Sequence, residues 1–199
     1  MIAETLMSVA RKMGGSVVSD LQRLVRNKKY EFDDQCGLLI SGAHVRGDLE
    51  VFAPDGKGWL AEHNLWTIEG KNHTLDVILH GGTAVGTWYV APFSGNVTVV
   101  DTWTAATFTA AATEVTAYSE STRVAYVETA ASSGSVNNTA SPAVFTASTD
   151  AVSIYGGGLL SVATKSATTG TLLAASKYSS ARVLATTGDT LGIRWTISL

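Results

Sequence analysis

The sequence predicts a mainly β protein: an antiparallel β-sandwich or jelly-roll-like domain that follows an N-terminal helical arm. Three observations support this class. Short apolar runs recur at strand spacing between Gly, Ser, Asn and Asp turns. Ser, Thr and Ala supply 52 of the 99 residues from Asp101 onward, which suits strands with small side chains. The first thirty residues instead follow a helical period, so we expect an arm at 1–30 and one domain at 31–199.

The predicted arm is amphipathic. Its apolar residues repeat at intervals of three and four, before and after a break at Gly14-Gly15, and Ser16 is a suitable N-cap for the second half. Basic residues on the same segment outnumber acidic ones by six to two. The residues we expect to dock a partner are Ile2, Leu6, Val9, Met13, Val17, Leu21, Leu24, Arg23 and Arg26.

Several roles are open for a basic amphipathic segment. Its apolar stripe can pack on its own domain, or it can dock on another protein, a membrane surface or a nucleic acid. The net charge of −3 for the 199 residues argues against nucleic-acid binding. The sequence also has no run of about 18 apolar residues, the length that could span a bilayer. We therefore expect neither a nucleic acid nor a membrane as partner.

Residues 35–66 have the pattern of a β-meander. Apolar runs at 37–44, 49–53 and 59–66 are separated by Arg46-Gly47-Asp48 and by Pro54-Asp55-Gly56. Both triplets are predicted as turns, although the first also matches an adhesion tripeptide by its letters.

One internal helix is predicted at about 67–80. Ile68, Leu75, Ile78 and Leu79 share a helical face, and Thr67 is a suitable N-cap. Gly81-Gly82 would end the helix.

The remainder is predicted as strands, beginning at 87–93. The glycine run at 156–158 indicates a bulge or a close backbone contact, because no Lys-Ser or Lys-Thr follows as in a phosphate loop. The last candidate strand alternates polar and apolar residues. Further candidates lie near 97–101, 123–129, 143–147, 152–164, 171–176, 182–186 and 190–198.

Catalytic and metal-binding motifs are lacking, so we expect no enzyme, cofactor or metal. Cys36, the single cysteine, is predicted as a small core residue. His73 and His80 would lie roughly 10 Å apart on the predicted helix, too far for one ion. A glycoside hydrolase needs only two facing carboxylates, which no motif excludes.

Core and interface packing is predicted for four tryptophans, Trp59, Trp66, Trp88 and Trp103.

Several segments between residues 60 and 199 resemble, in order and spacing, a group of bacteriophage virion proteins encoded near the major capsid protein. They include His63-Asn64-Leu65, Glu69-Gly70, Leu75-Asp76-Val77, Leu79-His80-Gly81-Gly82 and Thr87-Trp88-Tyr89-Val90. The likeness continues at Thr116-Ala117-Tyr118, Glu120, Arg123, Ala125-Tyr126, Gly134-Ser135-Val136, Asn138, Ala140, Lys165, Gly170-Thr171-Leu172 and Gly188-Asp189-Thr190-Leu191.

The resemblance implies a non-enzymatic virion protein, made in the host cytoplasm. Its expected role is a head decoration or cement protein that bridges capsid subunits, with the major capsid protein and its own copies as partners, for instance in a trimer. The alternative is a tail, neck or fibre component, including a receptor-binding one. The resemblance does not extend to the arm.

Overall fold

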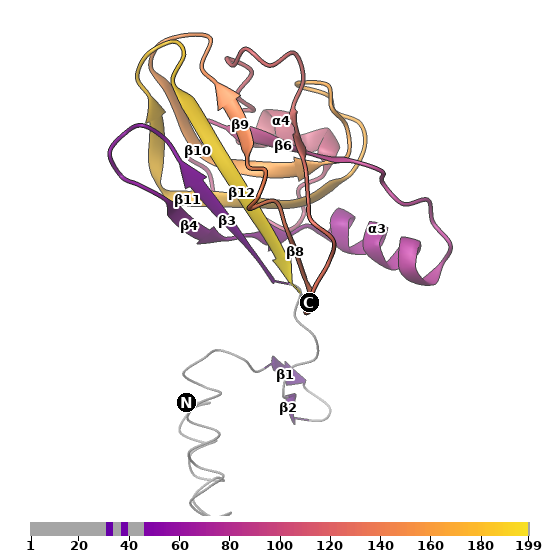
Figure 1. Ribbon diagram of the computed structural model, residues 1–199. Helices are drawn as coiled ribbons and strands as arrows, with labels where there is room; N and C mark the ends of the chain where they lie inside the picture. The colour runs from indigo at the N-terminus through magenta and orange to yellow at the C-terminus, as the bar shows by residue number, and fades with distance from the viewer. Residues whose placement is uncertain (1–30, 34–36, 40–45, 199) are drawn as a thin grey trace, which may run out of the picture. The chain divides into compact units, whose positions relative to one another are not determined.

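The structure is a computed structural model that describes residues 31–33, 37–39 and 46–198. The predicted arm and Cys36 lie outside these residues. The chain divides into two units, residues 1–44 and 45–199, which are described separately. In the first, β1 (Glu31–Asp33) and β2 (Gly37–Leu39) form an antiparallel pair. The other elements that the structure describes belong to the second unit (Figure 1).

Two antiparallel sheets make up most of the second unit, so the mainly β prediction is confirmed. The first sheet has the strand order β5-β11-β10-β6-β7. In that order its strands are Leu65–Trp66, Leu172–Leu184, Val152–Leu160, Trp88–Phe93 and Val124–Tyr126.

The second sheet is built around β12 (Thr190–Ser198). Its order is β4-β3-β12-β8. The strand β9 pairs with residues 190–193 of β12, on the same side of β12 as β8, which pairs with residues 196–198. The four strands around β12 are β3 (Arg46–Phe52), β4 (Leu60–His63), β8 (Ser135–Asn137) and β9 (Ala143–Thr146).

Apolar side chains of both sheets form one buried cluster. The predicted alternation of β12 is confirmed, since Leu191, Ile193 and Trp195 are fully buried. They share the cluster with Leu159 of β10 and Leu173 of β11. Buried Asn138 completes the ladder beside β12: its Oδ1 accepts from Trp195 N–H at 2.6 Å, and its Nδ2 donates to the Ile193 carbonyl.

The predicted internal helix is confirmed as α3 (Ile68–Leu79). Thr67 is its N-cap, with the hydroxyl accepting from Gly70 N–H at 2.9 Å. Gly81 follows the helix with a φ of +71°, a left-handed conformation that glycine adopts at little cost.

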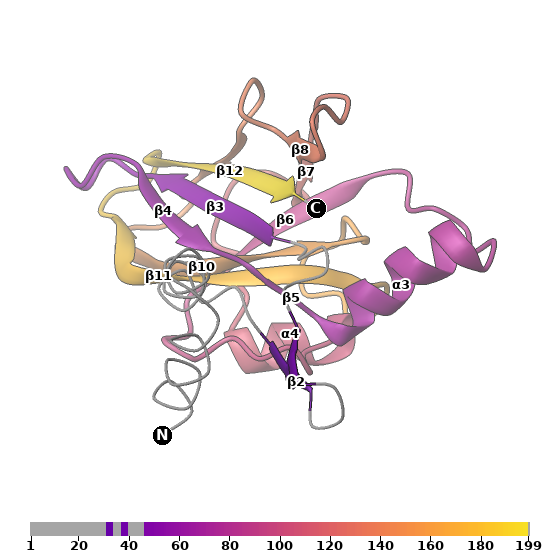
Figure 2. The same cartoon turned by 90° about the horizontal axis from the view of Figure 1, so that it is seen from below.

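A second helix, α4 (Ala105–Ala112), was not predicted. Alternating Thr and Ala suggested β-structure, but Ala105, Phe108 and Ala112 form a helical stripe that packs on the first sheet in a second cluster. Figure 2 shows α4 on the side of β10 and β11 away from β12. The strand predicted near 97–101 is absent, since no strand is assigned between β6 and α4.

Other strand predictions were wrong in detail. The segments 171–176 and 182–186 belong to one strand, β11, and β8 was missed. The meander fails because 59–66 splits into β4 and β5, which join different sheets. Arg46-Gly47-Asp48 is no turn but the start of β3, opposite Thr196–Ser198 of β12.

The glycine run in β10 makes the predicted close contacts. A Cβ at Gly156 would lie 2.2 Å from the Phe93 ring and from the Ser176 carbonyl, and one at Gly158 would lie 2.6 Å from the Phe108 ring. The pairing of β10 with β11 also shifts register between Ile154 and Gly156. Glycine here lets β10 lie close to the Phe93 and Phe108 rings on the α4 side of the sheet.

Asp150 links the turn before β10 to the turn before β12. Its Oδ1 accepts hydrogen bonds from the Thr187 N–H at 2.7 Å and from the Thr187 hydroxyl at 2.8 Å. Chiefly through the backbone bond, this contact holds the pKa of Asp150 below its ordinary value.

We expect the variant Asp150→Asn to unfold at a lower temperature than the native chain at neutral pH. Because the folded-state pKa is depressed, this stabilisation is present above the ordinary pKa of 3.8 and is lost as the pH falls through the folded-state value. Thermal unfolding from neutral pH to about pH 2 should therefore show the two midpoints converging. A difference that stays constant with pH would show that the carboxylate charge is not its cause.

Candidate functional site

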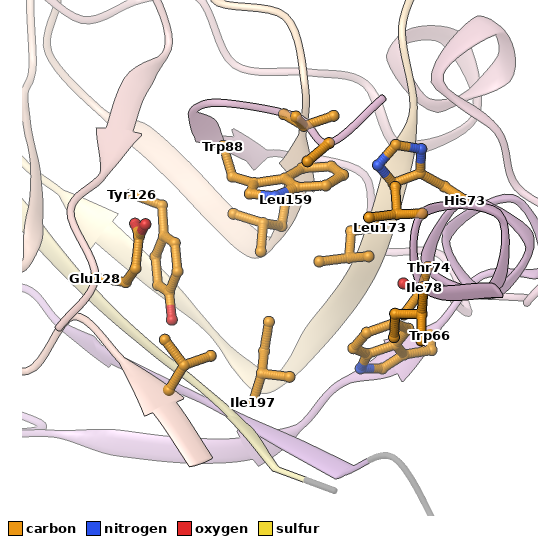
Figure 3. Close-up of a pocket in the computed structure, with 14 residues that line it drawn as sticks. Trp66, His73, Thr74, Ile78, Trp88, Tyr126, Glu128, Leu159, Leu173 and Ile197 are labelled. Carbon is orange, nitrogen blue, oxygen red and sulfur yellow. The ribbon is translucent and has the colours of Figure 1, made fainter. Parts of the chain in front are cut away.

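An apolar groove of about 370 Å³ opens between α3, the segment that follows it and the ends of both sheets. We call it the α3 groove. Figure 3 shows aromatic side chains from separate strands around the space: Trp66 of β5, Trp88 of β6 and Tyr126 of β7. Ile197 of β12 lies at one end, and Ile78 of α3 lines one side, next to Trp66. The volume falls in the usual range for binding pockets.

The first turn of α3 fixes this helix beside the groove. The buried Thr67 hydroxyl donates to the Leu172 carbonyl, while the Thr67 N–H donates to the Leu173 carbonyl at 3.1 Å. Gly70 lies so close to β11 that a Cβ would come within 2.2 Å of the Leu173 carbonyl oxygen. Among the residues of α3, Gly70 alone is buried.

Glu69 connects α3 to the rest of the fold. Its Oε2 accepts from the Ala105 N–H at 2.8 Å, at the first turn of α4, and from the Leu172 N–H at 2.6 Å, at the start of β11. A carboxylate at a helix N-terminus satisfies a free amide and interacts favourably with the helix dipole. The charge of Glu69 is thus used in holding three elements together.

The predicted apolar face of α3 is exposed instead of packed against the sheets. The exposed fractions are 46 % for Ile68, 54 % for Leu75, 66 % for Ile78 and 77 % for Leu79. A helix of a globular domain ordinarily turns such a stripe toward the core. A contiguous exposed apolar surface beside a groove marks a site of interaction.

Polar groups in the α3 groove are few, and two of them, the hydroxyls of Thr74 and Tyr126, are hydrogen-bonded to backbone carbonyls. The His73 ring packs edge-on against Trp88, with ring centroids 5.7 Å apart. Tyr126 donates its hydroxyl to the Trp195 carbonyl at 3.1 Å. Burial, and to a lesser degree Glu128, raises the pKa of Tyr126 well above its ordinary value, so the phenol is neutral.

Glu128 is the one carboxylate among the groove-lining residues. A glycoside hydrolase of the usual kind places two carboxylates across a cleft, and the α3 groove lacks that pair. The lining therefore offers apolar and aromatic contacts to a ligand. Glu128 adds one acidic group at the rim.

Three acidic residues of the second half, Glu114, Glu120 and Asp189, make bonds within the fold. Glu114 forms a buried two-point ion pair with Arg123, at 2.8 and 2.7 Å. Glu120 accepts from the Thr146 N–H, and Asp189 from Thr186 in a turn.

The histidines do not meet. His63 contacts Asp48 at 2.6 Å on the second sheet, His73 lies in the groove, and His80 caps α3. In the described part of the chain no three His, Cys, Asp or Glu residues gather as a metal site would require. His44 is outside that part, as are the nine arm residues from Ile2 to Arg26.

The tryptophans divide between core and surface. Trp66 and Trp103 are buried, as predicted. Trp59 is 43 % exposed and lies on the outer side of the second sheet. Its ring centroid is 5.6 Å from that of Phe52, and the Arg194 guanidinium carbon is 3.9 Å from the Trp59 ring centroid. It forms a smaller apolar patch, separate from the α3 groove.

The sequence did not indicate the groove itself. Trp66, Trp88, Tyr126 and Ile197 come from four strands that only the sheet pairing brings together. The helix predicted at 67–80, with its four large apolar residues, was the one part of the groove that the sequence indicated.

Neither protein-family models nor curated proteins give a match to this chain. No helix among the described residues is both long and apolar enough to cross a membrane.

Proposed function

We propose that this protein is a structural component of a tailed-bacteriophage particle. In this proposal it is a head decoration or cement protein, a non-enzymatic β-sandwich with an N-terminal helical arm. It is made in the host cytoplasm, and in the virion it bridges the major capsid protein and further copies of itself. The resemblance to virion proteins over residues 60–199 suggested this role.

The exposed apolar surface of α3 and its groove is the observation that carries the proposal. A protein whose task is contact needs a firm body and an unoccupied apolar surface. Here α3 is anchored to β11 and α4 by its first turn, through Thr67, Glu69 and Gly70, and it presents Leu75, Ile78 and Leu79 to solvent.

The body beneath that surface is stabilised by two buried ion pairs. Arg123 pairs with Glu114, and Arg182 pairs with Asp55 at 3.0 Å; the guanidinium groups of both are buried and also donate to backbone carbonyls. These bonds tie loops to the sheets, as suits a protein that must keep its shape in a shell.

The location and copy number of the chain in the particle test this function. An electron-microscopy map of the phage that encodes it should show copies spread over the whole head, on the outer surface. Copies confined to one vertex or to the tail would favour the alternative, a tail, neck or fibre component. Absence from the purified particle would overturn both.

Removing the arm gives a second test. Particles assembled with a chain lacking residues 1–30 should carry fewer copies and should lose shell stability on heating. Unchanged occupancy and stability would refute the role of the arm in bridging.

A further inference from the structure

We propose that the α3 groove binds residues 1–30 of a second copy of this chain. The inference deepens the proposed function by naming the occupant of the groove, and it rests on that function for the expectation that copies lie side by side.

The shape and chemistry of the groove suit an amphipathic helix. The α3 helix with Ile78 borders the groove on one side, and aromatic and aliphatic side chains, among them Trp66, Trp88 and Ile197, line it around the space. Helices that bind such grooves insert apolar side chains spaced three and four residues apart. Leu75 and Leu79 extend the apolar surface along α3 beyond the groove itself.

Residues 1–30 have the complementary pattern. The stripe Val17, Leu21 and Leu24 has spacings of four and three, and Ile2, Leu6, Val9 and Met13 repeat it. An amphipathic helix with no apolar surface to cover would be only marginally stable alone in water. The sequence pattern of the segment and the apolar lining of the groove thus suit each other.

Charge also favours this pairing. Residues 1–30 carry six Lys and Arg against two Asp and Glu, whereas residues 45–199 carry eight against twelve. The two parts thus have opposite net charges of +4 and −4. Near the groove, the acidic Glu128 and Asp76 are exposed, and Lys71 is the one basic residue of α3. Such complementarity increases the association rate and sets orientation.

The start of β3 fits an exchange between two copies. Gly47 pairs with Ile197, and Ile197 pairs with Val136; the last two residues line the groove. The first residues of β3 therefore lie at the edge of the groove. Two copies that face each other at this edge can exchange their N-terminal segments reciprocally, each filling the partner's groove.

Two single variants of the full chain separate the groove from the segment. Ile78→Asp places a charge in the groove wall at an exposed position, and Leu21→Asp places one in the apolar stripe of the segment. In sedimentation velocity the native chain should self-associate, and each variant should raise the dissociation constant about tenfold or more. Val144→Asp, at an exposed position of β9 away from the groove, is the matched control and should associate like the native chain.

Mixing the two variants is the decisive measurement. The Ile78→Asp chain has an intact segment and the Leu21→Asp chain an intact groove, so an equimolar mixture should form a one-to-one complex that neither forms alone. Circular dichroism of each variant should match that of the native chain.

Failure of the mixture to form this complex would overturn the inference. It would point instead to a contact between two α3 helices, which the Ile78→Asp chain lacks and mixing cannot restore. A native chain that stays monomeric up to its solubility limit would also overturn it. Both results leave the decoration role intact, since that role is tested by the location of the chain in the particle.

Discussion

Replacing Arg123 by methionine is expected to lower the free energy of unfolding by about 3 to 5 kcal/mol, the usual cost of removing one partner of a buried ion pair. The side chains of Arg123 and Glu114 are both 0 % exposed. The guanidinium also donates to the carbonyls of Val162 and Ala167, at 3.0 and 3.1 Å. The variant leaves a buried carboxylate and two carbonyls without these donors. Urea unfolding of the full chain measures the loss.

Two further variants test the cause. The double replacement Glu114→Leu with Arg123→Met should recover part of the loss, because it removes the uncompensated charge. Glu50→Gln breaks the exposed pair with Arg194, at 3.8 Å, and should cost about 1 kcal/mol or less. If Arg123→Met cost no more than Glu50→Gln, the buried pair would not be a main contributor to the stability of the fold.

Replacing Gly70 by alanine should both destabilise the protein and displace α3. Alanine is favoured over glycine in a helix by about 1 kcal/mol, so propensity alone predicts a gain. The new Cβ, however, would lie 2.2 Å from the Leu173 carbonyl oxygen and 2.7 Å from the Leu173 Cα, and neither backbone atom can yield without moving β11. We expect a net loss of about 1 to 3 kcal/mol, the usual cost of overpacking.

Gly86→Ala is the matched control for this variant. A Cβ at Gly86 meets nothing within 4 Å, and Gly86 has no positive φ. Its unfolding midpoint should equal or slightly exceed that of the native chain. Tryptophan fluorescence should change only in the Gly70→Ala variant, because Trp66 and Trp88 line the groove that α3 borders. Equal midpoints for the two variants would contradict the close packing of α3 on β11.

Local patterns were sufficient to predict many elements of the fold. Thr67 and Gly81 bound α3 as expected, because caps depend on a few neighbouring residues. The period-two pattern of β12 was also sufficient, since one of its faces is buried along most of its length. These signals are contained within a single element and do not depend on tertiary partners.

Elements whose pattern depends on distant partners were missed. In β11, Ser179 and Ser180 are exposed and resemble a turn, yet the strand continues beyond the shift in its pairing with β10. In α4, the stripe of Ala105, Phe108 and Ala112 is buried because it packs against Phe93 and Leu172, which come from distant strands. The groove depends in the same way on strand pairing that no local pattern indicates.

The central position of β12 bears on how the chain reaches its fold. Residues 46–52 of β3 find their partner about 140 residues later in the sequence, and β8 and β9 also pair with this last strand. Closing such long loops is slow, and during synthesis the apolar faces of β3 and β9 remain without their shared neighbour until residues 190–198 have been made. We therefore expect β3 and β9 to be the aggregation-prone part of an incomplete chain, and the charges of Asp48, Glu50 and Glu62 on β3 and β4 to help keep it soluble until then.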